Sequence, residues 1–211
     1  MRALIIVGIQ NDFLPGGALP VRDGDAIIPV LNKLQQYFDT IIATQDWHPA
    51  NHSSFASNHP GKEKFDEIYL HGEPQTLWPD HCVQDTPGAE LTPLLNQNLV
   101  EAIIRQGIAS DIESYSGFYD NDHLTATGMA GYLKNKGIKE VYVAGLAGDY
   151  CVYYTAMDSL REGFKTFIIE DATRSFSREA FNEAMSVFIS AGGKTILSDS
   201  IINVAHRSET N

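Results

Sequence analysis

The stretch Glu140-Val-Tyr-Val-Ala-Gly-Leu-Ala-Gly-Asp-Tyr-Cys-Val152 joins a β-branched apolar run to a helical pattern, and the predicted fold depends on it. The apolar run stops at Gly145, and the helical pattern starts after Asp149. A strand that ends at glycines and enters a helix leaves unpaired backbone N–H groups and the positive end of the helix dipole at the break. Cys151 lies in the first helical turn, where a thiol is expected to favour the nucleophilic thiolate form. The alternative is a small buried cysteine, which is the usual situation of a free thiol.

Similar apolar runs alternate with helical patterns along the rest of the chain. Strands are predicted at 3–7, 39–44, 99–104, 140–144, 165–170 and 194–197, and helices at 25–37, 126–136, between Asp149 and Gly163, and at 178–191. Continuous apolar runs are typical of strands that are buried on both faces of a parallel sheet. Strands that alternate with helices imply right-handed βαβ units. The predicted fold class is therefore α/β, a doubly wound parallel sheet with helices on both faces, formed as one domain over residues 1–211.

Composition and charge narrow the classes of partner. The chain has 211 residues, 43% of them hydrophobic, which is enough for a full core in one domain. Its formal net charge of −12 argues against nucleic acid or an anionic membrane surface as a partner, since both require a basic face. The first residues lead directly into a strand, and no segment is apolar enough to span a bilayer, so we expect a cytoplasmic protein. Cys82 and Cys151 are expected to be free thiols. The sequence leaves the oligomeric state open, a homo-oligomer included.

The predicted sheet indicates where a ligand binds. In a doubly wound sheet the ligand lies at the carboxyl ends of the strands, near the switch in strand order. The loops after Gly8, Thr44, Ile104 and Ala144 are therefore expected to surround one crevice. The segment 45–88 shows little periodicity, and a structureless loop of that length inside a compact domain is usually functional.

One part of this long segment has the residues of a metal site. Asp46 and His48 stand two positions apart, with His52 close behind, and His81 follows in the segment Trp78-Pro-Asp-His-Cys82. Histidine and carboxylate ligands that leave coordination positions open suit zinc in a catalytic site, or Fe(II) and Mn(II). The alternative is that these histidines are polar loop residues. We predict one divalent metal ion, with zinc as the first choice.

Aromatic residues lie in the same predicted loops. They are Phe13, Trp47, Trp78 and Tyr115. Packing in the core or over the site is the commoner role of such residues. The other possibility is that two of them stack against an aromatic substrate. The sequence leaves both possibilities open.

Five segments together resemble the nicotinamidases (nicotinamidase/pyrazinamidase), within the isochorismatase-like cysteine hydrolases. They are Gln10-Asn-Asp-Phe13, Gln45-Asp-Trp-His-Pro-Ala-Asn-His52, Trp78-Pro-Asp-His-Cys-Val83, Ser114-Tyr-Ser-Gly-Phe118 and Gly145-Leu-Ala-Gly-Asp-Tyr-Cys-Val152. The resemblance implies a Rossmann-like doubly wound fold and hydrolysis of a small-molecule aromatic amide, nicotinamide, to nicotinate and ammonia.

The resemblance also implies a role for each site residue. Cys151 would be the nucleophile, and the backbone N–H groups of Ala147 and Cys151 would form the oxyanion hole after a cis peptide between Leu146 and Ala147. The metal ligands would be Asp46, His48 and His81, with His52 as a further candidate. Phe13, Trp78 and Tyr115 would line the ring pocket.

Two positions depart from the family pattern. The family has an aspartate at the end of the first strand and a lysine just before a glycine after the third strand, and here these positions are Gly8 and Gln106. The aspartate would be the proton acceptor, and the lysine would lower the thiol pKa. Asp111, Glu113 and Asp149 are candidates for a substitute base. Two hypotheses follow: a working hydrolase with substitute acid–base chemistry, or a weak or inactive relative that binds a pyridine-type ligand or a metal.

Overall fold

The central feature of the computed structural model, which describes residues 1–209 and their side chains through Asn203, is a six-stranded sheet. All of its strand pairs are parallel, and the strand order is β5-β2-β1-β6-β7-β8. The strands are β1 (Arg2–Val7), β2 (Thr40–Asp46), β5 (Ala102–Gln106), β6 (Glu140–Gly145), β7 (Lys165–Thr173) and β8 (Lys194–Ile196). The direction of winding changes between β1 and β6, which are adjacent, and this confirms the predicted doubly wound sheet.

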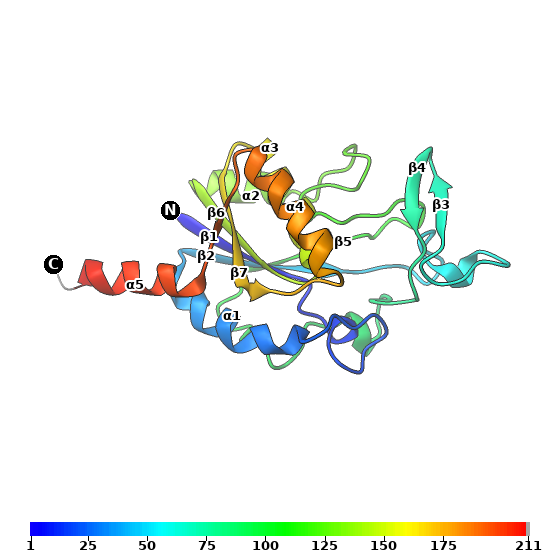
Figure 1. Ribbon diagram of the computed structural model, residues 1–211, viewed down its shortest axis with the longest axis horizontal. Helices are drawn as coiled ribbons and strands as arrows, with labels where there is room; N and C mark the ends of the chain where they lie inside the picture. The colour runs from blue at the N-terminus through cyan, green and yellow to red at the C-terminus, as the bar shows by residue number, and fades with distance from the viewer. Residues whose placement is uncertain (210–211) are drawn as a thin grey trace.

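Helices cover both faces of this sheet (Figure 1). They are α1 (Ile28–Leu34), α2 (Met129–Asn135), α3 (Tyr153–Arg161), α4 (Arg178–Ser190) and α5 (Ser198–Glu209). Figure 1 shows α1 and α5 on one side of the sheet and α2, α3 and α4 on the other. None of the helices in the described part of the chain has the length and apolar character needed to cross a membrane.

Strand β1 shows why the sheet has a core on each face. Successive side chains of a strand point to opposite faces, so an unbroken apolar run supplies both. Leu4 and Ile6 pack in the cluster that includes α1 and α5, whereas Ala3 and Ile5 pack in the cluster that includes α2, α3 and α4. All four side chains are fully buried. The apolar run recognised in the sequence is thus the centre of two cores.

Truncation of a buried side chain in this strand is expected to destabilise the protein strongly. Ile5→Ala removes methyl and methylene groups from a side chain that is 0% exposed, and such changes cost ~2–5 kcal/mol. Ile103→Ala in the edge strand β5 is the matched control, because that side chain is 48% exposed. In urea unfolding, the midpoint concentration for Ile5→Ala should be clearly lower than that of the parent protein. The midpoint for Ile103→Ala should be almost the same as that of the parent. Equal losses would contradict the assignment of β1 to the centre of the core.

Two predictions from the sequence are wrong in detail, and one helix was missed. The segment 45–88 is not structureless, because it contains the antiparallel hairpin β3 (Glu67–Leu70) and β4 (Glu73–Thr76), which projects from the body in Figure 1. The strand predicted at 99–104 lies at Ala102–Gln106 instead, since Leu99 is a half-exposed loop residue. Helix α5 was not predicted.

Candidate active site

The site lies at the carboxyl ends of the strands, where the loops after β1, β2, β5 and β6 meet, as predicted. A narrow cleft lies there. Its lining consists of Phe13, Leu19, Asp46, His48, Trp78, His81, Glu113, Tyr115, Ala147, Tyr150, Cys151 and Phe176. Eight of these were predicted as site residues from the sequence, namely Phe13, Asp46, His48, Trp78, His81, Tyr115, Ala147 and Cys151. The structure brings all eight to one place.

Cys151 is presented by a sharp change from strand to helix. After β6 the peptide bond between Leu146 and Ala147 is cis, as the resemblance implies. The chain then forms one turn of π-helix at Gly148–Val152 before α3 starts at Tyr153. The backbone N–H of Ala147 acts on the Cys151 thiol as a hydrogen-bond donor and lowers its pKa. This backbone group therefore lies beside the Cys151 thiol.

The prediction that this turn favours the thiolate form of Cys151 is wrong. Burial raises the pKa of Cys151 well above its usual value, and the carboxylates of Asp46 and Glu113 raise it further. The Ala147 N–H opposes this shift but does not overcome it. Cys151 is free, as is Cys82, which confirms the prediction of no disulfide. Formation of the Cys151 thiolate therefore depends on groups that remove the thiol proton.

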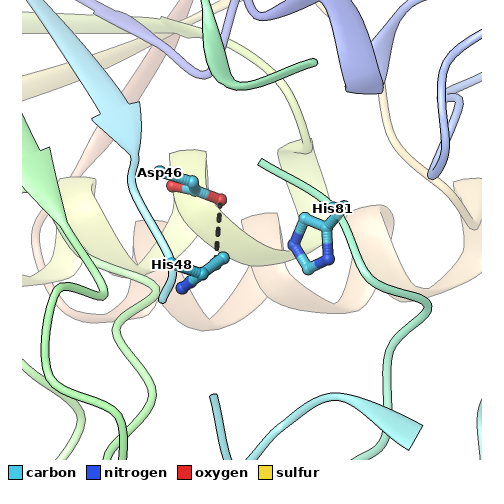
Figure 2. A group of neighbouring side chains, drawn as sticks. All are labelled: Asp46, His48 and His81. Carbon is cyan, nitrogen blue, oxygen red and sulfur yellow. Dashed lines mark ion pairs between the residues drawn. The ribbon is translucent and has the colours of Figure 1, made fainter. Parts of the chain in front are cut away.

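Asp46, His48 and His81 form a compact buried group (Figure 2). One potential ligand atom from each residue lies within 4.8 Å of the others, and the dashed line in Figure 2 joins Asp46 Oδ2 to His48 Nε2, 3.9 Å apart. Nδ1 of His48 is 2.9 Å from the carbonyl oxygen of Gly107, and Nδ1 of His81 is 2.8 Å from that of Pro79. Because a carbonyl oxygen only accepts, both Nδ1 atoms carry the proton, and both Nε2 atoms keep a free lone pair.

The electrostatics of this group fit a divalent cation. Burial lowers the pKa of His48 to about 3 and that of His81 to about 4, so both rings are neutral, the form that binds metals. Burial and the nearby Glu113 raise the pKa of Asp46. Among the residues that line the cleft there is no lysine or arginine to offset these two carboxylates. Two neutral imidazoles and a carboxylate with free lone pairs are a ligand set that zinc accepts.

Asp46 is held in place by Gln10. The side-chain amide of Gln10 donates to the Asp46 carbonyl oxygen at 2.8 Å, and its oxygen accepts from the Asp46 N–H at 2.7 Å. Both contacts are buried. Gln10 therefore fixes the backbone that carries the carboxylate, a role that the sequence alone did not reveal.

His52 lies behind the metal-binding group and does not line the cleft. Its Nδ1 is 2.8 Å from Ser54 Oγ and its Nε2 is 3.1 Å from the carbonyl oxygen of Ile112. Both nitrogens are therefore occupied by protein partners. A second group of buried residues that includes His52, His48 and Glu113 is also close enough to hold an ion, but the Nε2 bond to Ile112 competes with that arrangement.

The ring pocket is built from more aromatic side chains than the sequence indicated. Trp78 Nε1 donates to the Tyr115 hydroxyl at 3.0 Å, which fixes two of the predicted rings. Tyr150 lies next to Cys151 in the chain and packs edge-on against Trp78, with ring centroids 5.0 Å apart. Phe176 follows the carboxyl end of β7. The sequence would have indicated this residue if the loop after β7 had been included among the loops predicted to surround the crevice. Trp47 does not line the cleft, because its ring stacks under the Arg105 guanidinium at 3.7 Å.

Gly8 and Gln106 are not among the residues that line the cleft. Gly8 has a φ of +60°, and a Cβ atom there would be 2.7 Å from the carbonyl oxygen of Leu146. Gln106 donates from Nε2 to the Ser114 carbonyl oxygen at 3.1 Å, while its buried Oε1 has no partner among the described residues. The local backbone of this chain therefore suits glycine at position 8, and an aspartate there would require it to shift.

A side chain at position 8 is expected to destabilise the protein. Gly8→Ala adds a Cβ atom both in a left-handed conformation and against the Leu146 carbonyl. Gly16→Ala is the matched control, because Gly16 has a φ of +93° but nothing within 4 Å of its Cβ position. Chemical denaturation should show Gly8→Ala to be less stable than Gly16→Ala by ~1–3 kcal/mol, the usual cost of overpacking. Equal stabilities would mean that the contact with Leu146 relaxes freely.

Comparison with known proteins agrees with this geometry. The family model of the isochorismatase domain matches residues 2–200. A nicotinamidase of Acinetobacter baylyi is 48% identical over 201 residues, covering 95% of this chain and 94% of the relative. The nicotinamidase of Escherichia coli is 44% identical, covering 92% of this chain and 93% of the relative.

Three solved structures with the same fold are nicotinamidases or pyrazinamidases. An Acinetobacter baumanii nicotinamidase/pyrazinamidase superposes with a TM-score of 0.92 at 47% identity, covering 95% of this chain and 97% of its own. The yeast nicotinamidase bound to the inhibitor nicotinaldehyde has a TM-score of 0.90 at 33% identity, with 93% and 100% covered. A Pyrococcus horikoshii pyrazinamidase in complex with zinc has a TM-score of 0.76 at 39% identity, with 93% and 98% covered.

A family match over almost the whole chain, the doubly wound sheet and the cleft at its switch point together define the class: the chain belongs to the isochorismatase family. Within that family its relatives are nicotinamidases, and the chain is an amidohydrolase of the nicotinamidase type. The alternative hypothesis of an inactive ligand-binding relative finds no support among these proteins.

Proposed function

We propose that this protein hydrolyses nicotinamide, and related aromatic amides such as pyrazinamide, to the acid and ammonia through a thioester on Cys151. The observation that carries the proposal is the convergence of three features in one cleft. They are the thiol of Cys151, the potential metal ligands Asp46, His48 and His81, and the rings of Phe13, Trp78 and Tyr115. Relatives bound to nicotinaldehyde and to zinc support the same assignment.

In the first half of the reaction the Cys151 sulfur attacks the carboxamide carbon. The thiol proton moves to a base, the carbonyl oxygen becomes an oxyanion near the Ala147 N–H, and the base returns the proton to the nitrogen as ammonia leaves. In the second half water attacks the thioester, and the base carries a proton from that water to the sulfur. The products are the carboxylic acid and the free thiol.

The rings and the polar residues have separate roles in this scheme. Phe13 and Trp78 hold the ring of the substrate so that its amide reaches Cys151. Asp46, His48 and His81 would hold the metal, which supplies Lewis-acid polarisation or orientation of the substrate when it is bound. Zinc is the metal we propose, with Fe(II) and Mn(II) as alternatives.

Glu113 is the carboxylate best placed to be the base. Of the three substitutes considered from the sequence, it is the one that lines the cleft with Cys151, and its side chain is buried. Asp111 is exposed and lies outside the cleft lining. Both carboxylate oxygens of Asp149 accept backbone hydrogen bonds, from the N–H groups of Phe176 and Ser177.

Glu113→Gln is expected to lower kcat for nicotinamide by ~100-fold, the lower end of what positioned acid–base help contributes. The variant keeps the shape of the side chain and its bond from the Ser114 N–H while removing the ability to accept a full proton. Asp111→Asn is the control and should retain the parental rate. Ammonia release under saturating nicotinamide measures both. A Glu113→Gln variant as fast as the parent would exclude Glu113 as the base.

The proposed function is tested by product formation from three amides. Purified protein with added Zn²⁺ is incubated with nicotinamide, pyrazinamide or benzamide, and the acid product is separated and quantified. Nicotinamide and pyrazinamide should be hydrolysed, whereas benzamide, which lacks a ring nitrogen, should react much more slowly. Absence of acid and ammonia above the background of the Cys151→Ala variant would refute the proposal.

A further inference from the structure

Phe176 stands at the mouth of the cleft. It comes from the loop between β7 and α4, and its side chain is 38% exposed. The residues deeper in the cleft are almost fully covered: Cys151 is 7% exposed and Trp78 is 5% exposed. Phe176 is thus the most exposed of the residues that line the cleft.

The loop that carries Phe176 is tied to the turn that carries Cys151. Asp149, two positions before the cysteine, accepts from the Phe176 N–H at 3.1 Å and from the Ser177 N–H at 2.9 Å. The Gly148 N–H donates to the Arg174 carbonyl oxygen at 2.7 Å. The carboxyl group of Asp149 is largely buried, which strengthens such bonds. The backbone of Phe176 is therefore held close to the turn that carries Cys151.

Phe176 also packs against two other rings of the pocket. It stacks on Trp78 with centroids 6.0 Å apart and an interplanar angle of 28°, and it meets Tyr150 edge-on at 6.1 Å. Trp78 and Tyr150 contact each other, so the three rings form a closed triangle. The three rings therefore form one aromatic cluster in the wall of the cleft.

We propose that Phe176 sets the upper size limit of the substrate ring, so that the cleft accepts single six-membered aromatic amides and excludes fused bicyclic ones. This inference rests on the proposed function. In this proposal the amide carbon lies at Cys151 and the ring extends toward Phe176, the most exposed residue of the lining. A second fused ring on the edge nearest Phe176 would need the space that the Phe176 side chain fills.

The test compares nicotinamide with quinoline-3-carboxamide, which has the same amide and ring nitrogen plus a fused ring. The ratio of the two kcat/KM values is measured for the parent and for Phe176→Ala, Phe176→Leu and Phe176→Trp. Phe176→Ala should reduce the preference for nicotinamide by ~10-fold or more, the discrimination that a few carbon atoms supply in an apolar pocket. Phe176→Leu should give an intermediate ratio, and Phe176→Trp should increase the preference.

Phe65→Ala is the matched control. Phe65 is also an exposed aromatic residue that contacts Trp78 edge-on, with centroids 6.1 Å apart, but it does not line the cleft. Its removal should leave the ratio unchanged. If Phe65→Ala changed the ratio as much as Phe176→Ala does, the effect would come from loosening Trp78, and the inference would be overturned.

Binding of the two acids, nicotinate and quinoline-3-carboxylate, separates this inference from the proposed function because it requires no turnover. Dissociation constants from titration calorimetry should show the same shift in preference for Phe176→Ala. A parent that hydrolyses neither amide but shows this shift would refute the function and retain the inference. Equal ratios for the parent and for all three Phe176 variants, in both turnover and binding, would overturn the inference.

Discussion

Cys151→Ala is expected to lower the rate of ammonia release from nicotinamide by ~1,000-fold or more, because only binding and oxyanion contacts would remain. The side chain is buried in the cleft beside the Ala147 N–H, so alanine removes the sulfur with little change in packing. Cys82→Ala is the matched control, since Cys82 is the other free thiol and is a fully buried core residue. The control should retain the parental rate per folded molecule.

Mass spectrometry after a rapid acid quench is a second test of the role of Cys151, because it detects the acyl group on the protein. The parent and Cys82→Ala should carry one nicotinoyl group on a fraction of the molecules, whereas Cys151→Ala should carry none. Ammonia release by Cys151→Ala at the parental rate would refute the thioester mechanism. A nicotinoyl group on Cys82 would place the nucleophile elsewhere.

Loss of a metal ligand is the second large effect that we expect. His81→Ala should lower both metal content and activity, the latter by more than ~100-fold, since even the loss of an outer-sphere contact costs up to that amount. His81 offers an unpaired Nε2 toward Asp46 and His48, so its removal leaves two ligands in place of three. Elemental analysis of protein dialysed against Zn²⁺ measures the stoichiometry, and ammonia release measures the activity.

Two other histidines give this experiment its controls. His59 binds the Ser53 carbonyl oxygen at 2.7 Å and belongs to neither metal-binding group, so His59→Ala should retain both metal and activity. His52→Ala should retain the metal but lower the free energy of unfolding, because both of its nitrogens have partners. Metal loss in His52→Ala equal to that in His81→Ala would make His52 a ligand. Treatment of the parent with a chelator should abolish activity, and Zn²⁺, Fe²⁺ or Mn²⁺ added back singly would identify the metal.

The sheet was predictable from the sequence because its strands are buried on both faces. The unbroken runs at Ala3–Val7 and Glu140–Ala144 have few alternatives to a parallel sheet. Strand β5 was misplaced because it is an edge strand, where Ile103 and Arg105 face solvent and the apolar signal is weak. The hairpin β3–β4 was missed because its strands are short and partly exposed, with Pro74 in one of them.

Site residues were predicted where the type of residue and its place at a strand end agreed. Asp46, His48, His81 and Cys151 met both conditions. The raised pKa of the Cys151 thiol could not be predicted. It depends on burial and on the carboxyl groups of Asp46 and Glu113, which approach the thiol only in the folded protein. Phe176 was missed because the loop after β7 was not among the loops predicted to surround the crevice.

The pairing of β1 with β6 has a consequence for the order in which the protein can fold. Arg2 pairs with Glu140 and Val7 with Gly145. The two strands that flank the switch point are therefore separated in the sequence by residues 8–139. Contacts between segments so distant in sequence form slowly, because a long loop must close first. During synthesis, Asp46 and His81 are complete long before β6 exists to support Cys151. Potential metal ligands are thus available on the growing chain before Cys151 is.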